Sequence, residues 1–114
     1  MKQLKQFCTG KTILIADQAI EQLYAIDLAR NLSAHLITIP SGEKAKSKET
    51  ADQLIEQLFR LGCGRDTTLI ALGGGVTTDL VGYVASTYMR GLPLILIPTT
   101  LLAMVDSSIG SKNK

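Results

Sequence analysis

Residues 67–88 read TTLIALGGGVTTDLVGYVASTY, an apolar run that leads through three consecutive glycines into a segment with helical periodicity. Glycine loses more backbone freedom on folding than any other residue, so three in one short turn require a physical reason. A strand that enters a glycine-rich turn at a helix N-terminus leaves main-chain N–H groups free, and the helix dipole favours an anion there. We interpret Gly73, Gly74 and Gly75 as a site for a nucleotide pyrophosphate. A tight turn that only packs the strand against the helix is the alternative.

The same alternation of short apolar runs and helical periods continues on both sides of this segment. Runs that are apolar throughout are typical of parallel strands buried on both faces, so the pattern predicts an α/β fold: a Rossmann-like parallel sheet with helices on both faces. Pro98 ends the last strand, Ser47 caps the second helix, and Gly62 ends that helix. The predicted strands are 12–16, 35–39, 67–72 and 92–97, and the predicted helices are 19–32, 47–61, 78–88 and 100–108.

In the second helix one apolar stripe is expected to face the core, formed by Ala51, Leu54, Ile55, Leu58 and Phe59. We treat residues 1–114 as one domain. Because the sequence stops at GSKNK without a closing element, we expect it to be the N-terminal part of a longer protein whose second domain is absent.

Composition narrows the class of protein. Of 114 residues, 46% are apolar and 19% are charged, which is typical of a globular domain. A net charge of +2 and an aromatic content of 4% argue against nucleic-acid binding. The two cysteines and the single histidine, His35, have no metal-binding spacing, so we expect reduced thiols and no metal site in this chain. The sequence contains no secretory signal and no apolar run long enough to span a bilayer, which predicts a cytoplasmic protein.

Charged residues near the predicted strand ends are further candidates. Glu43 follows the second strand, where dinucleotide folds commonly hold an adenosine ribose, and Lys46 is placed to pair with it. Asp79 lies near the start of a helix, where it is close to a ligand or simply complements the dipole. Arg90 follows a helix C-terminus, where it complements the dipole or grips a phosphate or carboxylate. For the loop with Glu43, a solvated turn is the alternative.

The segment after the fourth strand carries four more candidates. Thr99 and Thr100 stand at the carboxyl end of a strand, where open α/β sheets bind ligands, although both are also ordinary helix-capping residues. Asp106 and Lys112 bracket the small polar segment SSIGS, either as ligand-binding charges or as charges that confer solubility.

Together these residues resemble the 3-dehydroquinate synthase family. The stretch ALGGGVTTDLVGYVASTYMRGLPLILIPTTLLAMVDSSIGSK, residues 71–112, is similar to the family pattern ALGGGV..DL.G..A..Y.RG......PTTLL..VD.S.GGK. SGEKAKS resembles the earlier G-E-x-x-K-S segment, and ADQAI resembles the first nucleotide loop. A triple glycine alone is weak support for this resemblance, whereas all these segments in one order and spacing are specific to the family. The resemblance covers nearly the whole chain.

This resemblance implies an NAD-dependent and zinc- or cobalt-dependent lyase of the shikimate pathway. The family converts the sugar phosphate 3-deoxy-D-arabino-heptulosonate 7-phosphate to 3-dehydroquinate and releases phosphate. NAD transiently oxidises a ring hydroxyl, which acidifies the neighbouring C–H and allows phosphate to leave, while the protein supplies orientation and charge. The resemblance also implies a homodimer.

Roles are carried over from the family only onto matching positions. Asp17 is expected near the adenosine end of NAD, Glu43 and Lys46 at its ribose, and 74–76 along the pyrophosphate. The substrate-binding candidates are Asp106, Lys112 and Arg90, the last acting from a neighbouring subunit. The full set of cofactor-binding candidates is Asp17, Ser41, Gly42, Glu43, Lys44, Lys46, Gly74, Gly75, Val76, Thr77, Thr78, Asp79, Thr99, Thr100 and Lys112.

Three positions depart from the family pattern. Thr78 and Ser111 stand where the family has glycine, and Asn113 replaces a threonine. Thr78 is therefore expected to crowd the cofactor loop. The family's metal ligands, a glutamate and two histidines of a helical second domain, are not in this sequence. We expect that the 114 residues alone do not catalyse the reaction.

Three alternatives remain at the level of sequence. One is a related sugar phosphate cyclase that makes 2-deoxy-scyllo-inosose from glucose 6-phosphate. Another is an iron- or zinc-dependent alcohol dehydrogenase of the glycerol dehydrogenase type, against which YMRG and VDSSIGSK argue. The third is a binding module that holds NAD without turnover.

Overall fold

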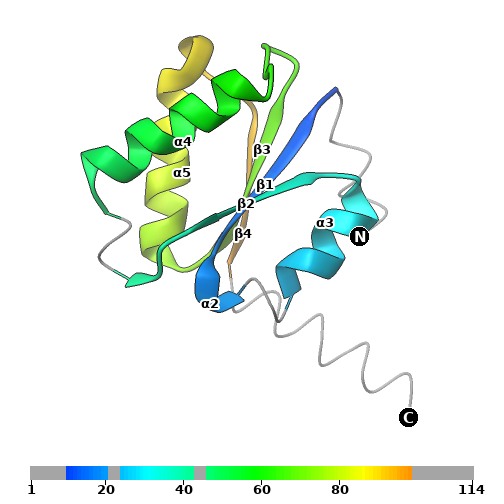
Figure 1. Ribbon diagram of the computed structural model, residues 1–114, viewed down its shortest axis with the longest axis vertical. Coiled ribbons are helices and arrows are strands. Elements are labelled where there is room, and N and C mark those ends of the chain that lie inside the picture. Colours follow the sequence, from blue (N-terminus) through cyan, green and yellow to red (C-terminus); the bar gives the residue numbers. More distant parts are fainter. Residues whose placement is uncertain (1–9, 21–23, 43–45, 99–114) are drawn as a thin grey trace.

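The structure is a computed structural model that describes residues 10–20, 24–42 and 46–98 (Figure 1). Short buried strands alternate with helices along the chain, as the sequence predicts. The strands are β1 (Thr12–Asp17), β2 (His35–Ile39), β3 (Thr68–Gly73) and β4 (Leu94–Pro98). The helices are α2 (Gln18–Ile20), α3 (Ile26–Leu32), α4 (Lys48–Arg60) and α5 (Gly75–Thr87), with a 3₁₀ turn, η3 (Tyr88–Arg90), after α5.

The four described strands form one parallel sheet in the order β2-β1-β3-β4. This confirms the predicted parallel α/β fold. The chain moves from β1 to β2 on one side and from β3 to β4 on the other, so the strand order reverses between β1 and β3. In open α/β sheets a ligand crevice lies outside the carboxyl ends of the strands at such a switch point. The topology therefore indicates where a site is to be sought.

Helices cover both faces of the sheet, which explains why the strands are apolar throughout. Ile13 and Ile15 pack on the side of α4 and α5, whereas Leu14 and Ala16 pack on the side of α3. All four side chains are fully buried. Burying one such aliphatic side chain stabilises the fold by about 1.5–3 kcal/mol. Figure 1 shows α4 and α5 together on one side and α3 on the other.

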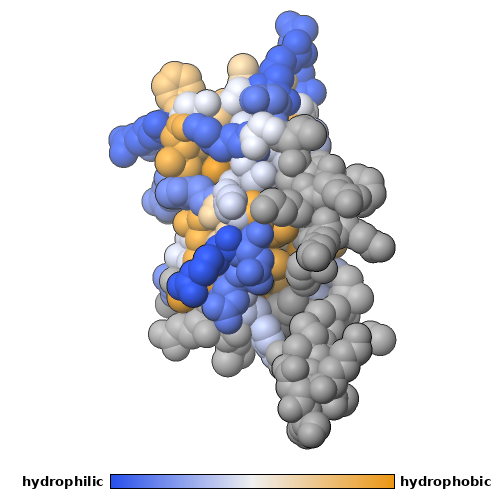
Figure 2. Space-filling view, turned by 90° about the vertical axis from the view of Figure 1, so that its right-hand side faces the viewer, coloured by the Kyte–Doolittle hydropathy of each residue, from blue (hydrophilic) through white to orange (hydrophobic). Residues whose placement is uncertain are grey.

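The surface on the α3 side is mixed in character. In the space-filling view that looks onto this side, hydrophilic side chains cover the middle of the face and apolar ones show between them (Figure 2). Within the part of the chain that the structure describes, no helix has both the length and the apolar character that a bilayer span requires.

Helix α4 begins and ends at the predicted residues. The Ser47 hydroxyl accepts a hydrogen bond from the Thr50 N–H at 3.1 Å, which caps the helix. At the other end Gly62 is left-handed, with φ 73°, and its N–H and that of Cys63 donate to carbonyls of the last turn. The predicted apolar stripe is wrong at one position, because Phe59 is 77% exposed.

Helix α5 differs from the prediction in its start. The sequence predicts a helix from residue 78, but α5 begins at Gly75. Glycine is unfavourable in a helix by only about 1 kcal/mol relative to alanine, so packing of the apolar face overrides it. The glycine turn and the first turn of the helix are thus one structure. Strand β4 likewise begins at Leu94 rather than at residue 92.

Candidate functional site

The turn from β3 into α5 depends on Gly73 for reasons internal to the chain. Its φ of 155° lies in a region that L side chains rarely adopt. A Cβ at this position would come within 2.9 Å of Cβ and Oγ1 of Thr77, whose side chain is buried beneath the turn. Close packing of strand against helix therefore explains the first glycine.

Packing within the chain does not explain the next two glycines. A Cβ built on Gly74 or Gly75 meets no atom of the described chain within 4 Å. Gly74 is the N-cap of α5, and no side chain caps this helix end. The Thr78 N–H makes the first helical bond, to the Gly74 carbonyl at 3.0 Å, so the N–H groups of residues 75–77 precede any helical acceptor. Side chains at residues 74 and 75 would occupy the space in front of these N–H groups. Without them, the exposed amides fit the diphosphate of a dinucleotide.

Two predicted residues lie at the switch point beside this turn. Because Ala16 is paired with Leu72, continuing the register by one residue places Asp17 next to Gly73. The carboxylate oxygen Oδ1 of Asp17 accepts hydrogen bonds from Ala19 N–H at 2.8 Å and from Ile20 N–H at 3.1 Å. The Ala19 N–H also contacts the Ser41 hydroxyl at 3.2 Å. The loops that follow β1 and β2 are therefore joined at the carboxyl edge of the sheet.

A groove of about 330 Å³ separates the start of α4 from the first turns of α5. Its floor and walls are mainly apolar, with Tyr83 on one side. Lys46 and Lys48 supply positive charge from the α4 side, and Asp79 supplies one carboxylate from α5. The lining is Lys46, Ser47, Lys48, Ala51, Val76, Asp79, Leu80 and Tyr83.

The groove brings together residues that the sequence predicts and others that it does not identify. Lys46, Val76 and Asp79 are predicted cofactor residues, and they converge from segments about thirty residues apart. Tyr83, which is 55% exposed, is not among the predicted residues. A signal for it exists, because Val76, Asp79 and Tyr83 follow the spacing that places side chains on one helix face. Shape and charge suit an aromatic ring or ribose with a phosphate close by.

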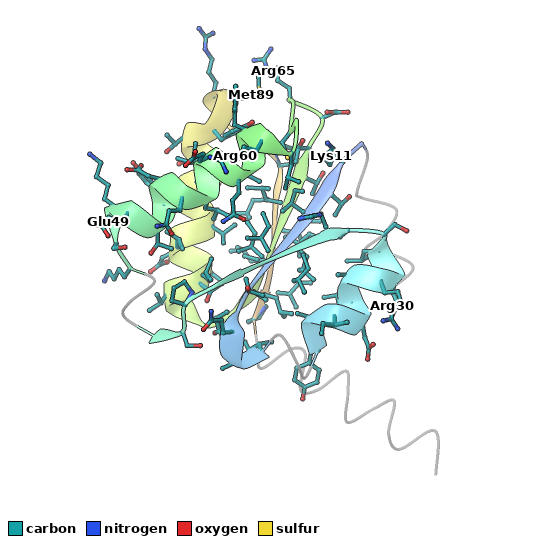
Figure 3. All side chains as sticks on the ribbon, in the orientation of Figure 1. Lys11, Arg30, Glu49, Arg60, Arg65 and Met89 are labelled. Atoms are coloured by element: carbon teal, nitrogen blue, oxygen red, sulfur yellow. The ribbon has the colours of Figure 1, made fainter. Side chains whose placement is uncertain are left out.

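Arg90 lies away from these residues. It is in η3, after the C-terminus of α5, whereas the glycine turn is at the N-terminus of the same helix. Figure 1 shows the two at opposite ends of the sheet, and Figure 3 labels Met89 and Arg65 at that far end. Arg65, Met89 and Arg90 line a separate pocket there, of about 240 Å³. Arg90 therefore does not contribute to the crevice of its own chain.

The other predicted positions have different outcomes. Ser41 and Gly42 are exposed in the loop after β2, and Thr78 is half-buried in the first turn of α5. Within residues 10–20, 24–42 and 46–98, no group of three or more His, Cys, Asp or Glu side chains is arranged to hold a metal ion. Six predicted site residues lie outside the described residues: Glu43, Lys44, Thr99, Thr100, Asp106 and Lys112.

The fold is that of a Rossmann-like α/β domain, and the uncapped N-terminus of α5 lies at the carboxyl edge of its sheet. Comparison with known proteins identifies the family of this domain. Residues 36–114 match the model of the family described as 3-dehydroquinate synthase N-terminal. The chain belongs to this family.

Two relatives show how much of a whole protein the chain represents. It is 50% identical over 107 residues to the 3-dehydroquinate synthase of Latilactobacillus sakei, which covers 90% of this chain and 30% of the relative. It is 51% identical over 112 residues to the pentafunctional AROM polypeptide of Pneumocystis carinii, which covers 89% of this chain and 7% of that polypeptide. The chain thus spans less than a third of either relative.

Solved structures share the fold over most of the chain. A 2-deoxy-scyllo-inosose synthase in complex with carbaglucose-6-phosphate, NAD⁺ and Co²⁺ has a TM-score of 0.79 and 26% identity, covering 86% of this chain and 29% of that one. The 2-epi-5-epi-valiolone synthase of Streptomyces hygroscopicus, with NAD⁺ and Zn²⁺ bound, has a TM-score of 0.76 and 35% identity, covering 90% and 30%.

Proposed function

We propose that this chain is the NAD-binding portion of a 3-dehydroquinate synthase. Family membership supports the proposal, and the NAD⁺ in two structural neighbours agrees with it. The single observation that carries the proposal is the N-terminus of α5, where no side chain caps the helix and the Cβ positions of Gly74 and Gly75 are open. The turn is built to admit a ligand against the main chain.

In this proposal the residues around the crevice bind different parts of NAD. The amides of residues 75–77 bind the pyrophosphate, and the helix dipole adds favourable potential. Asp17 binds at the adenosine side of the cofactor, and its carboxylate is held in place because Oδ1 accepts hydrogen bonds from the N–H groups of Ala19 and Ile20. Lys46 and Tyr83, from opposite walls of the groove, flank the nucleoside. When bound, NAD supplies a transient hydride acceptor, and these residues fix its position.

The remainder of the proposed site is supplied from elsewhere. The position of Arg90 at the far end of the sheet requires that, if it binds the substrate phosphate, it does so in the crevice of a second subunit. This supports a homodimer. We further propose that the sugar phosphate substrate and a zinc or cobalt ion bind in a region of a longer protein that includes a helical second domain.

Calorimetric titration tests the cofactor proposal directly. We expect saturable binding of NAD, weaker binding of ADP, and a further loss with adenosine, which lacks the diphosphate that the amides hold. Because part of the attraction is electrostatic, the affinity is expected to fall as salt is raised. Equal affinity for adenosine and NAD, or no binding of NAD, would contradict the proposal.

A turnover assay tests whether catalysis requires the proposed second domain. With NAD, zinc and 3-deoxy-D-arabino-heptulosonate 7-phosphate, we expect no release of phosphate by the 114 residues. A longer protein that contains the chain is expected to release phosphate and form 3-dehydroquinate. Activity of the 114 residues by themselves would contradict the proposed second domain.

A sugar phosphate cyclase of another specificity is the second candidate. The structural neighbour that binds carbaglucose-6-phosphate favours it, since the likeness covers 86% of this chain. A longer protein that contains the chain separates the two candidates when it is given 3-deoxy-D-arabino-heptulosonate 7-phosphate and glucose 6-phosphate in turn. We expect turnover of the first alone.

A further inference from the structure

Thr78 makes a hydrogen bond within the first turn of α5 that bears on the amide cradle. Its hydroxyl donates to the Gly75 carbonyl oxygen at 3.1 Å. That carbonyl and the N–H of Val76 belong to the same peptide group. In a trans peptide the two point in opposite directions within one plane, so restraining the oxygen also restrains the N–H.

The direction of this restraint matters. Helical carbonyls point toward the C-terminus and helical N–H groups toward the N-terminus, which here opens onto the crevice. The Thr78 hydroxyl therefore holds the Gly75–Val76 peptide from inside the helix while the Val76 N–H faces outward. A donor on the carbonyl also polarises the peptide, which makes its N–H a stronger donor. Both effects prepare the Val76 N–H for an anionic acceptor.

The alternative is that the Thr78 side chain obstructs the ligand. The position of Thr78 argues against obstruction of the groove between α4 and α5. Thr78 does not belong to the groove lining, which comprises Val76, Asp79 and Tyr83 on the α5 side. Thr78 shares a helix row with Gly82, four residues later, whose Cβ position lies 3.8 Å from the Leu94 side chain. The threonine thus stands on the β4 side of the helix rather than between α4 and α5.

We propose that Thr78 is a positioning residue that holds the Gly75–Val76 peptide plane and so preorganises the Val76 N–H for the pyrophosphate. This rests on the proposed function of the turn. Where the family pattern has glycine, this second hydrogen bond is missing, and only the regular helical bond to the Gly75 carbonyl holds the peptide. The threonine would then raise affinity for the dinucleotide instead of obstructing it.

Three variants of Thr78 test this role. Thr78→Val keeps the branched shape and removes the hydroxyl, Thr78→Ser keeps the hydroxyl, and Thr78→Gly removes the side chain. By titration with NAD we expect Thr78→Val to bind about three- to tenfold more weakly, since a neutral hydrogen bond contributes on that order. Thr78→Ser is expected to remain within about twofold of the unsubstituted chain.

A second readout reports the peptide without the ligand. The Val76 amide proton resonance is expected to move upfield in Thr78→Val and to return in Thr78→Ser, while the melting temperatures stay close. Equal affinity in all variants, an unmoved Val76 resonance, or tighter binding by Thr78→Gly would overturn the positioning role. If the unsubstituted chain does not bind NAD at all, the proposed function fails as well, and the Val76 resonance still shows whether the hydroxyl holds the peptide.

Discussion

Helices α4 and α5 have the same length and cover the same face of the sheet, but their N-termini are built differently. Ser47 closes the start of α4 with its own hydroxyl, 3.1 Å from the Thr50 N–H. Gly74 stands at the same position of α5 and contributes no capping side chain. Both ends border one groove. A glycine N-cap is less stable than a capping side chain by only about a few tenths of a kcal/mol, so the bare terminus of α5 leaves its amides open to a ligand at a small cost in stability.

The glycines of the two helices show the same contrast. Gly62, after α4, serves hydrogen bonds of the chain itself, since its N–H donates to the Phe59 carbonyl at 3.0 Å. Gly74 and Gly75, before α5, face open space. A glycine whose Cβ position is empty and whose φ is ordinary has no steric reason in the folded chain, and this distinguishes a binding turn from a structural one.

The largest expected effect is a loss of folding stability on substitution of Gly73, whose role is structural, unlike that of the two glycines that follow it. Gly73→Ala is expected to destabilise the fold by about 3 kcal/mol, because its φ of 155° is strained for alanine and the new Cβ meets Thr77 at 2.9 Å. Urea denaturation measures this. Gly42→Ala is the matched control, with φ 72° and no atom within 4 Å, and is expected to cost about 1 kcal/mol from strain alone. Equal losses would show that contact with Thr77 contributes nothing.

Adding a cap to α5 should make it resemble α4. Gly74→Asp is expected to raise stability by about 1 kcal/mol through capping and the dipole. The same carboxylate would repel the diphosphate and lower NAD affinity at least about tenfold. Gly74→Asn adds the cap without the charge and should give a smaller loss. Paired urea denaturation and titration measure both quantities, and unchanged NAD affinity in Gly74→Asp would remove the pyrophosphate from this turn.

Removing the cap of α4 is the converse change. Ser47→Ala is expected to cost about 1 kcal/mol of stability, since the hydrogen bond from the Thr50 N–H to the Ser47 hydroxyl is removed. Ser47→Asn, which retains a capping oxygen, should recover most of this loss in thermal or urea denaturation. The loss of NAD affinity should stay well below that of Gly74→Asp. If Ser47→Ala is as stable as the parent chain, the two termini do not differ as described.

The smallest expected effect is on the pH dependence of stability, and it arises at the amino end of the sheet. There the Tyr88 hydroxyl donates to the Cys63 carbonyl at 2.8 Å. Burial raises the pKa of the Cys63 thiol above its ordinary value of 9.0, and burial also raises the pKa of Tyr88. Because both folded-state pKa values are raised, the stability that they contribute is present below pH 9 and is lost as pH rises through the raised values.

Urea denaturation between pH 7 and pH 11 should therefore show a plateau followed by a decline. Cys63→Ala, which removes the thiol, should decline less steeply over the range just above pH 9. Stability that increases over this range would contradict the assignment.

Local chemistry in the sequence determined much of this protein. The strands were predictable because runs such as ILIA and LIAL leave no polar face, which only a sheet covered on both sides accommodates. The cap at Ser47 and the stop at Gly62 were predictable because both depend on nearest neighbours in the chain. The glycine turn between β3 and α5 was predictable as well, because three consecutive glycines between a strand and a helix are a local feature of the sequence.

Only the tertiary structure decided what long-range packing controls. The periodic pattern of α4 does not show that Phe59 is exposed while its neighbour Leu58 is fully buried. Nor does the sequence show that α5 begins at Gly75, with Thr77 buried against Gly73. That Lys46 and Tyr83 line one groove, and that Arg90 lies away from the crevice, depend on the order of the strands and on which end of a helix a residue occupies. A sequence pattern specifies which faces are apolar, but the distances between segments are set by the assembly of all the elements.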